Sequence, residues 1–186
     1  MTEKESFDSS TELPVQGMVQ IFTGEGKGKT TAAMGEVVRA VGHGRSVYIV
    51  FFMKGGDPSG EQSVLSKLPN VTIACFGTPG FVNPDNITAE DRKQAKLALA
   101  TASEAVLSSK YDLVVLDEIN LAASWELIKL EEVILLIMNK PEKVELILTG
   151  RHADSKLSQR ADLVTEMLKI KHPYDEGTIA RPGVEY

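Results

Sequence analysis

A glycine-rich loop at residues 23–31, with the sequence TGEGKGKTT, most constrains what this chain can fold into. The apolar run MVQIFT precedes the loop, and residues 30–41 follow it with small and apolar side chains at helical spacing. The loop nearly matches the phosphate-binding pattern G-x-x-x-x-G-K-[ST]. Gly28, Lys29 and Thr30 are in place, and Thr23 occupies the opening glycine position. The strand, loop and helix together predict a P-loop, whereas a flexible glycine-lysine turn would need neither neighbour.

Glycines in this loop let backbone N–H groups face phosphate oxygens without interference from a Cβ atom. The start of the following helix adds partial positive charge. The Lys29 amine can neutralise phosphate, and the Thr30 hydroxyl can ligate Mg²⁺. Because Thr23 replaces the opening glycine, the pattern does not decide which loop N–H group meets which phosphate. The Lys27 side chain could contact phosphate or simply be solvated. We expect phosphate contacts from Gly24, Glu25, Gly26, Lys27, Gly28, Lys29, Thr30 and Thr31.

Apolar runs and helical patterns alternate along the chain. Strands are predicted at 18–23, 47–52, 71–76, 113–116, 144–149 and 163–170, and helices at 30–41, 63–68, 88–108, 128–138 and 155–161. Thr88 and Asp91 form a capping-box pattern at the start of the third helix. Such alternation predicts an α/β fold, P-loop NTPase-like (RecA-like), with a parallel sheet of about six strands and helices on both faces. We assign residues 1–16 to a flexible arm and 17–186 to a single domain.

Two further signals follow predicted strands, where ligands bind in parallel sheets. The segment YDLVVLDE ends in Asp117 and Glu118, and a P-loop is commonly paired with such carboxylates for Mg²⁺. The segment LTGR places Arg151 at the same edge, where a guanidinium can meet phosphate. The alternative reading of Arg151 is an exposed arginine in an ordinary turn.

Composition narrows the classes of partner. The net charge of −6 gives no general attraction for nucleic acid or anionic lipid, so we expect neither as a partner. No apolar run approaches the ~18 residues of a membrane span, and the polar N-terminus lacks a signal region, so we expect a cytoplasmic protein. The single cysteine, Cys75, lies in the apolar run VTIACF and is predicted to be buried.

Several segments together resemble the P-loop corrinoid adenosyltransferases of the CobA/CobO/BtuR type. They are TGEGKGKTTAAMGEVVRAVGHG, YDLVVLDEIN, LILTGRHA, ADLVTEM and KHPYDEGTIARPGVEY, and the resemblance runs from about residue 17 to 186. It implies transfer of the 5′-deoxyadenosyl group of ATP to the cobalt of a cob(I) corrinoid, with release of tripolyphosphate. It places the enzyme in adenosylcobalamin biosynthesis or salvage.

The resemblance also implies roles for individual residues. Lys29, Thr30 and Glu118 would be catalytic, acting through charge stabilisation and positioning because cobalt itself is the nucleophile. Thr30 and Glu118 would be the leading ligands of Mg²⁺ or Mn²⁺. Asp117 would belong to the same metal site, next to those ligands rather than on the metal itself. Phe81 would lie beside the corrinoid, with a hydrophobic anchor of its own loop as the alternative. Asn83 stands where some members have tryptophan. The implied partners are ATP, a corrinoid, an electron-donating reductase and a second copy of the chain in a homodimer.

Two other functions remain open at the level of sequence. A P-loop NTPase or small-molecule kinase would use the same loop and carboxylates but release phosphate or ADP. A non-catalytic nucleotide-binding or corrinoid-carrier protein would not need the set formed by Lys29, Thr30 and Glu118. We therefore favour the adenosyltransferase.

Overall fold

Six parallel strands form one sheet in the computed structural model, which describes residues 16–185. The strands lie in the order β3-β2-β4-β5-β1-β6. Their bounds are β1 Val19–Thr23, β2 Val47–Phe51, β3 Val71–Cys75, β4 Leu113–Asp117, β5 Glu145–Thr149 and β6 Leu163–Glu166. The α-helices are α1 Lys29–Gly42, α2 Gly60–Leu65, α3 Ala89–Leu107, α4 Ile119–Ser124, α5 Leu130–Met138 and α6 Ser155–Ser158. Two 3-10 helices are η1 Pro84–Asn86 and η2 Pro173–Glu176.

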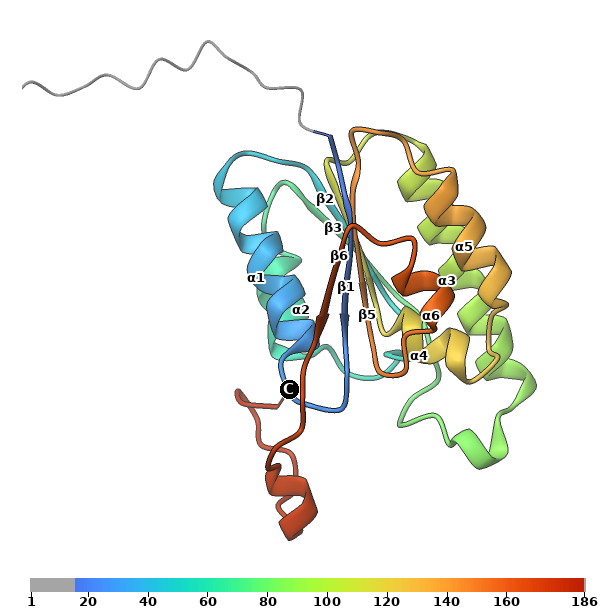
Figure 1. The fold of residues 1–186 in the computed structure, drawn as a ribbon. Helices are drawn as coiled ribbons and strands as arrows, with labels where there is room; N and C mark the ends of the chain where they lie inside the picture. Colours follow the sequence, from blue (N-terminus) through green and yellow to red (C-terminus); the bar gives the residue numbers. More distant parts are fainter. Residues whose placement is uncertain (1–15, 186) are drawn as a thin grey trace, which may run out of the picture.

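Helices cover both faces of the sheet. Figure 1 views the sheet edge-on, with α1 and α2 on one side and α3, α4, α5 and α6 on the other. Alternate residues of β4 supply the two cores: Leu113 and Val115 pack with α1, and Val114 and Leu116 pack with α3 and α5. A strand buried on both faces must be apolar throughout, which is why LVVL carried no alternation in the sequence. The predicted α/β, P-loop NTPase-like fold class is confirmed.

The predicted elements are present, with different ends. The helix predicted at 128–138 begins at Leu130, and the short helix α4 before it was not predicted. The strand predicted at 163–170 ends at Glu166, because its neighbour β1 ends at Thr23 where the P-loop turns away. The capping box of α3 is confirmed: Asp91 N donates to Thr88 Oγ1 at 3.1 Å, and Thr88 N donates to Asp91 Oδ2 at 2.9 Å. The predicted arm at 1–16 lies outside the described residues, apart from Gln16.

The prediction that Cys75 is buried is wrong, since this residue is exposed. Cys75 ends β3, which is an edge strand: among residues 16–185, its only neighbour in the sheet is β2. A central strand is covered on all sides, whereas an edge strand with the same apolar sequence leaves part of its surface open. The sequence does not reveal which strand occupies the edge.

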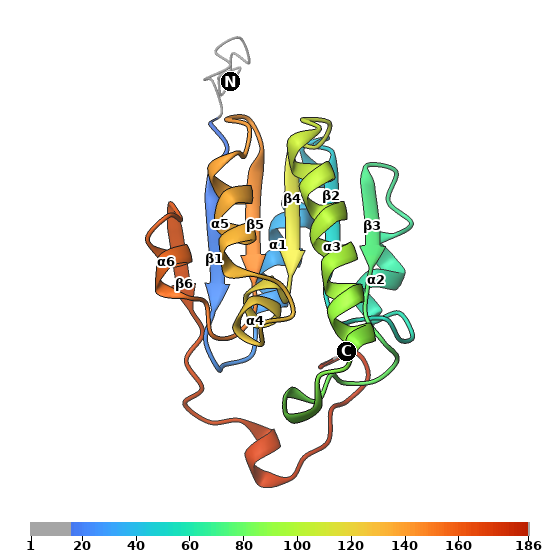
Figure 2. The ribbon, with the colours of Figure 1, turned by 90° about the vertical axis from the view of Figure 1, so that its right-hand side faces the viewer.

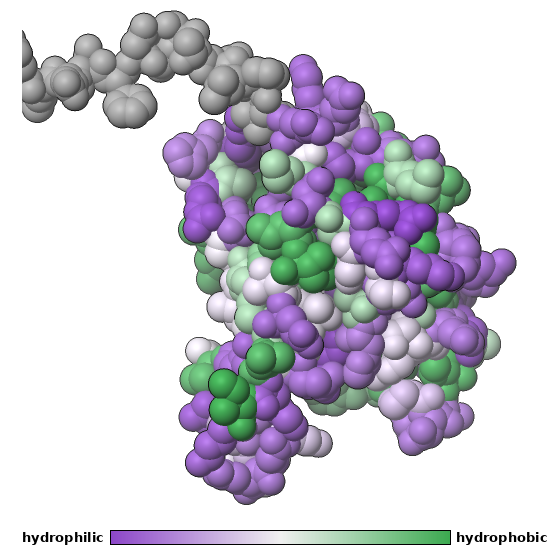
Figure 3. Space-filling view, in the orientation of Figure 1, coloured by the Kyte–Doolittle hydropathy of each residue, from purple (hydrophilic) through white to green (hydrophobic). Residues whose placement is uncertain are grey.

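The last part of the described chain crosses the carboxyl ends of the strands. Residues 167–185, here called the C-terminal segment, run below the sheet in both Figure 1 and Figure 2. Figure 3 shows hydrophobic and hydrophilic residues interspersed on a lobe at this end of the molecule. Its large exposed hydrophobic residues are Leu168, Ile170, Tyr174, Ile179 and Val184. The segment therefore lies at the edge where ligands of parallel sheets bind.

Candidate active site

The P-loop connects β1 to α1 at the carboxyl edge of the sheet. Gly28 is the N-cap of α1 with φ 121°, and Gly24 has φ 97°, a backbone conformation that side chains disfavour. A Cβ atom on Gly24 would lie 2.5 Å from the Met167 carbonyl oxygen. Met167 also pairs with the loop, accepting from Gly26 N at 2.6 Å and donating to Thr23 O at 2.8 Å. Gly24 is therefore required for close packing against the C-terminal segment, whereas Gly28 is required for its left-handed backbone.

Lys29 is buried and bound to its own loop. Its amine donates to the carbonyl oxygens of Gly24 and Gly26, each at 2.8 Å. Burial lowers the pKa of this amine, and the charge of Glu118 opposes that effect. The two carbonyls hold the amine inside the curve of the loop, which is where a P-loop lysine meets phosphate.

Asp117, the last residue of β4, has no exposed surface and uses both carboxylate oxygens. Oδ2 accepts from Lys54 Nζ at 2.7 Å, and Oδ1 accepts from the Thr149 hydroxyl at 2.7 Å. The pKa of Lys54 is raised: its burial acts to lower it, but the charge and hydrogen bond of Asp117 outweigh burial. Both carboxylate oxygens of Asp117 therefore already accept hydrogen bonds within the protein.

Glu118 is the carboxylate that remains without a partner. Its backbone is left-handed, with φ 65°, and its N–H donates to Thr149 Oγ1 at 3.0 Å. Its Oε2 is buried and makes no hydrogen bond with any residue that the structure describes. Burial raises the pKa of this carboxyl group, and the neighbouring charge of Asp117 adds to the effect. A buried, unpaired carboxylate oxygen next to a P-loop is suited to a cation.

Gly150 leaves room for this carboxylate. It has φ 125°, and a Cβ atom there would lie 3.2 Å from Glu118 Oε2 and 3.2 Å from Asn120 Cβ. The Asn120 amide donates to Gly150 O at 3.3 Å, and its Oδ1 is also buried without a partner. Two buried side-chain oxygens without partners thus belong to residues that pack against Gly150, directly after β5.

Arg151 lies at the lip of the P-loop. Its Nη1 is 3.4 Å from Glu25 Oε2, and His152 Nε2 is 3.5 Å from Glu25 Oε1. All three side chains are about half exposed, so these pairs contribute little to stability and can rearrange. The structure brings Arg151 and Glu25 together, which accords with the expected position of Arg151 at the phosphate edge.

The remaining predicted residues are spread around this centre. Thr30 is partly buried and Thr31 is exposed, both in the first turn of α1. The Lys27 amine donates to the Val184 carbonyl at 2.8 Å, so it binds the C-terminal segment in this state. Phe81 lies in the loop before α3 with its side chain fully exposed, which rules out a role as a hydrophobic anchor of that loop. Asn83 caps η1 by accepting from Asp85 N at 3.0 Å.

Sequence reasoning missed Lys54 and Thr149. Both stand at strand ends, Thr149 as the last residue of β5 and Lys54 three residues after β2. The rule that ligands bind at the carboxyl ends of parallel strands would have marked them, as it marked Arg151. Their pairing with Asp117 was not apparent because Lys54 is 63 residues away along the chain.

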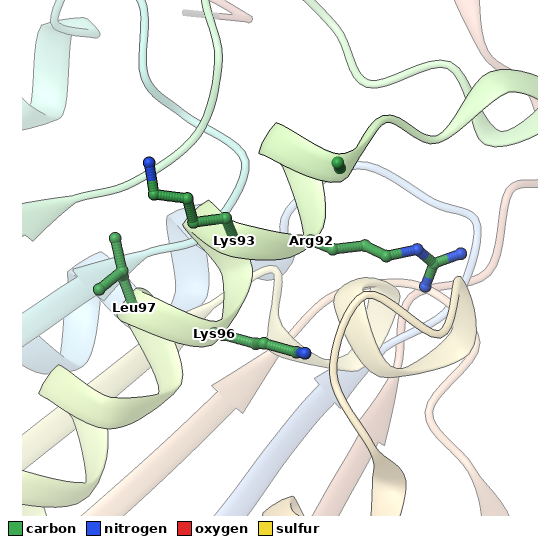
Figure 4. A pocket seen from close by; sticks show the side chains of 5 residues that line it. Arg92, Lys93, Lys96 and Leu97 are labelled. Atoms are coloured by element: carbon green, nitrogen blue, oxygen red, sulfur yellow. The ribbon is translucent and has the colours of Figure 1, made fainter.

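Two hollows open on the surface. A groove of about 730 Å³ runs beside the P-loop, and a second of about 540 Å³ lies on the first half of α3. Figure 4 shows that Arg92 and Lys96 extend to one side of α3, whereas Lys93 lies on the other. The second hollow contains no P-loop residue. The groove beside the P-loop is lined by Thr23, Gly24, Glu25, His152, Ala153, Ser155, Ser158, Gln159, Val164 and Glu166.

A comparison with known protein families shows which family this chain matches. Residues 15–186 match the family described as ATP:corrinoid adenosyltransferase BtuR/CobO/CobP. That match covers the P-loop, both strand-end carboxylates, Arg151 and the C-terminal segment. This chain belongs to that family.

Individual relatives agree over nearly the same length. The corrinoid adenosyltransferase of Escherichia coli K12 is 35% identical over 171 residues, which is 92% of this chain and 86% of the relative. The corrinoid adenosyltransferase of Sinorhizobium sp is 36% identical over 180 residues, 95% of this chain and 84% of the relative. The corrinoid adenosyltransferase CobA of Salmonella typhimurium LT2 is 35% identical over 171 residues. The resemblance to the corrinoid adenosyltransferases, inferred above from the sequence motifs, is confirmed.

Proposed function

We propose that this protein transfers the 5′-deoxyadenosyl group of ATP to the cobalt of a cob(I) corrinoid. The electron pair on cobalt forms the bond to C5′, the C5′–O bond breaks, and tripolyphosphate leaves with that bond's electrons. The observation that carries the proposal is the presence of both a buried P-loop amine, Lys29, and a buried carboxylate oxygen without a partner, Glu118 Oε2, in a chain that matches this family throughout.

The protein's task in such a reaction is to bind and stabilise the leaving group. The P-loop offers backbone N–H groups, the buried Lys29 amine and the start of a 14-residue helix to the triphosphate. Arg151, beside Glu25, supplies a second cation at the loop's lip. The nucleophile is the substrate's own cobalt, so no side chain has to act as nucleophile or general base. Catalysis then consists of positioning and charge stabilisation.

Magnesium fits the donors that are present. Glu118 Oε2 is a buried acceptor without a partner, and Thr30 lies in the first turn of α1, directly after Lys29. Within residues 16–185, no group of three or more His, Cys, Asp or Glu side chains converges as a metal cage. Mg²⁺ is commonly bound by one or two carboxylates together with substrate phosphates. We assign Thr30 and Glu118 as its ligands, where it would draw charge from the triphosphate.

The corrinoid would approach from the exposed side of the loop that carries Phe81. This aromatic side chain is unpacked and available for contact, while Asn83 is held as the cap of η1. The corrinoid must be reduced before transfer, so the proposal includes an electron-donating reductase. It also includes a cytoplasmic setting and a homodimer. Within the described part of the chain, none of the helices is both long and apolar enough to cross a membrane.

The test is an anaerobic assay with Mg-ATP and chemically reduced corrinoid, followed by visible spectroscopy and by analysis of the phosphate products. We expect a light-sensitive adenosylated corrinoid and tripolyphosphate in equal amounts. Release of phosphate or ADP without adenosylated product would instead assign the chain to the P-loop NTPases or small-molecule kinases. ATP binding with no turnover of any kind would assign it a carrier role.

A further inference from the structure

A charged chain of hydrogen bonds links three strand ends beneath the proposed metal position. It runs from the Lys54 amine to Asp117, from Asp117 to the Thr149 hydroxyl, and from Thr149 to the backbone N–H of Glu118. The three separations are 2.7, 2.7 and 3.0 Å. This series of hydrogen bonds ends at Glu118, whose Oε2 has no partner. Lys54 is therefore connected to Glu118 without contacting it.

Lys54 is held in place by its own backbone. Met53 before it is left-handed, with φ 57°, and Lys54 N donates to Phe76 O at 2.8 Å. Gly55 after it packs so closely that a Cβ atom there would lie 1.9 Å from Gly77 O. These contacts fix the backbone at Lys54, and the 2.7 Å hydrogen bond to Asp117 Oδ2 holds its amine.

The adjacent carboxylates of Asp117 and Glu118 pose a problem for metal selectivity. Both lie at the end of β4, adjacent in the sequence, so their negative charges repel each other. Without a counterion, the two would attract a cation even when no nucleotide is present. The Lys54 ammonium occupies Asp117 Oδ2, so only Glu118 remains open to a metal ion.

We infer that Lys54 is a positioning residue that neutralises Asp117 and thereby reserves the metal ion for Glu118 and the nucleotide phosphates. The inference rests on the proposed function for its metal and nucleotide. Lys54 itself contacts neither of them. Its effect is to keep the site closed to a bare cation and to hold Glu118 in its left-handed conformation through Thr149.

The test uses Mn²⁺ alone as probe, titrated by electron paramagnetic resonance at pH 8 without nucleotide. Lys54→Met removes the charge and is one heavy atom shorter, which leaves the ammonium's position open beside Asp117. We expect Lys54→Met to bind Mn²⁺ at least about tenfold more tightly than the parent chain, because the substitution removes the repulsion between the ammonium group and a divalent ion at the neighbouring carboxylates. Lys54→Arg keeps the charge and should bind Mn²⁺ like the parent.

A double variant separates the inference from its rivals. In Lys54→Met/Asp117→Asn, both charges are absent and the amide oxygen still accepts from Thr149. We expect Mn²⁺ binding by this double variant to return to the parent's level. Adenosylation should fall by about 10- to 100-fold in Lys54→Met, and the double variant should recover most of that loss. Parent-like Mn²⁺ binding by Lys54→Met, or equally tight binding by the double variant, would overturn the inference.

Other outcomes are equally informative. Weaker binding of metal-free ATP in both the single and double variants would mean that Lys54 contacts phosphate directly, and the inference would be wrong. If Lys54→Met does not fold but the double variant does, the neutralising role is supported, because the uncompensated Asp117 charge is then the fault. If the parent makes no adenosylated corrinoid while the Mn²⁺ pattern holds, the proposed function fails and the assignment of Lys54 stands.

Discussion

Replacing Glu118 with glutamine should make the unliganded protein more stable and the enzyme much slower. The carboxylate is buried, its Oε2 has no partner, and burial followed by the charge of Asp117 raises its pKa. A buried polar group without a hydrogen bond costs about 1–3 kcal/mol. Glutamine keeps the shape and removes the charge, so we expect the free energy of unfolding at pH 7 to rise by about 1 kcal/mol. For a chain of this size, that corresponds to an increase in Tm of about 2–4 °C.

The gain must depend on pH in a definite direction. Because the folded-state pKa of Glu118 lies above the ordinary value of 4.5, the folded chain binds more protons than the unfolded chain between those two values. The stability contributed by this group therefore falls as pH rises through that window, and the penalty is complete above the raised pKa. Glu118→Gln avoids the penalty, so its advantage should be present at pH 7 and disappear below about pH 4.5.

Ligand should reverse the order of stability. At a Mg-ATP concentration about 100 times its Kd, binding stabilises the parent by about 2.7 kcal/mol. The variant lacks the carboxylate that we assign to the metal and should gain far less. Thermal unfolding at pH 4 and pH 7, with and without Mg-ATP, measures all four cases. Adenosylation should fall by about 10²–10³-fold, the loss expected for one preorganised charge contact.

Three results would refute this reasoning. The first is a Glu118→Gln variant less stable than the parent at pH 7, which would mean that the carboxylate has a stabilising partner. The second is an equal difference at pH 4 and pH 7, since the charge would then be irrelevant. The third is an unchanged order of stability with Mg-ATP, which would remove Glu118 from the metal site.

Further substitutions test other parts of the site. Lys29→Ala should slow adenosylation by about 10²–10³-fold, whereas Lys143→Ala, an exposed lysine before β5, should not, and activity of Lys29→Ala within twofold of the parent would contradict its role. Gly24→Ala should lower the free energy of unfolding by about 1–3 kcal/mol, because φ is 97° and the Cβ atom would lie 2.5 Å from Met167 O. Gly35→Ala is its control: this helical position has nothing within 4 Å, and stability should rise by about 0.5–1 kcal/mol in denaturant unfolding. Phe81→Ala should weaken corrinoid binding by spectroscopic titration while changing stability by less than about 0.5 kcal/mol, since the side chain is fully exposed, and unchanged affinity would exclude it from the corrinoid site.

Much of the fold was predictable because its signals are local. The glycine loop, the fully apolar strand ending in Asp117 and Glu118, and the capping box of Thr88 and Asp91 each depend on residues close together in the sequence. Turn chemistry, capping and apolar periodicity act over a few residues, so they can be read along the chain. The parallel sheet and the position of the site at its carboxyl edge follow from the alternation of these elements.

Only the tertiary structure decided which side chains of the site pair with one another. The order of the strands put β3 at an edge and exposed Cys75, and it placed β4 between β2 and β5. Only then could Lys54 and Thr149, from those two neighbours, occupy both oxygens of Asp117 and leave Glu118 unpaired. Contacts of this kind join residues tens of positions apart, and their partners depend on which strands pair when the core is buried. Local sequence patterns carry no information about that choice, which is why the two carboxylates were predicted and the hydrogen-bond partners of Asp117 were not.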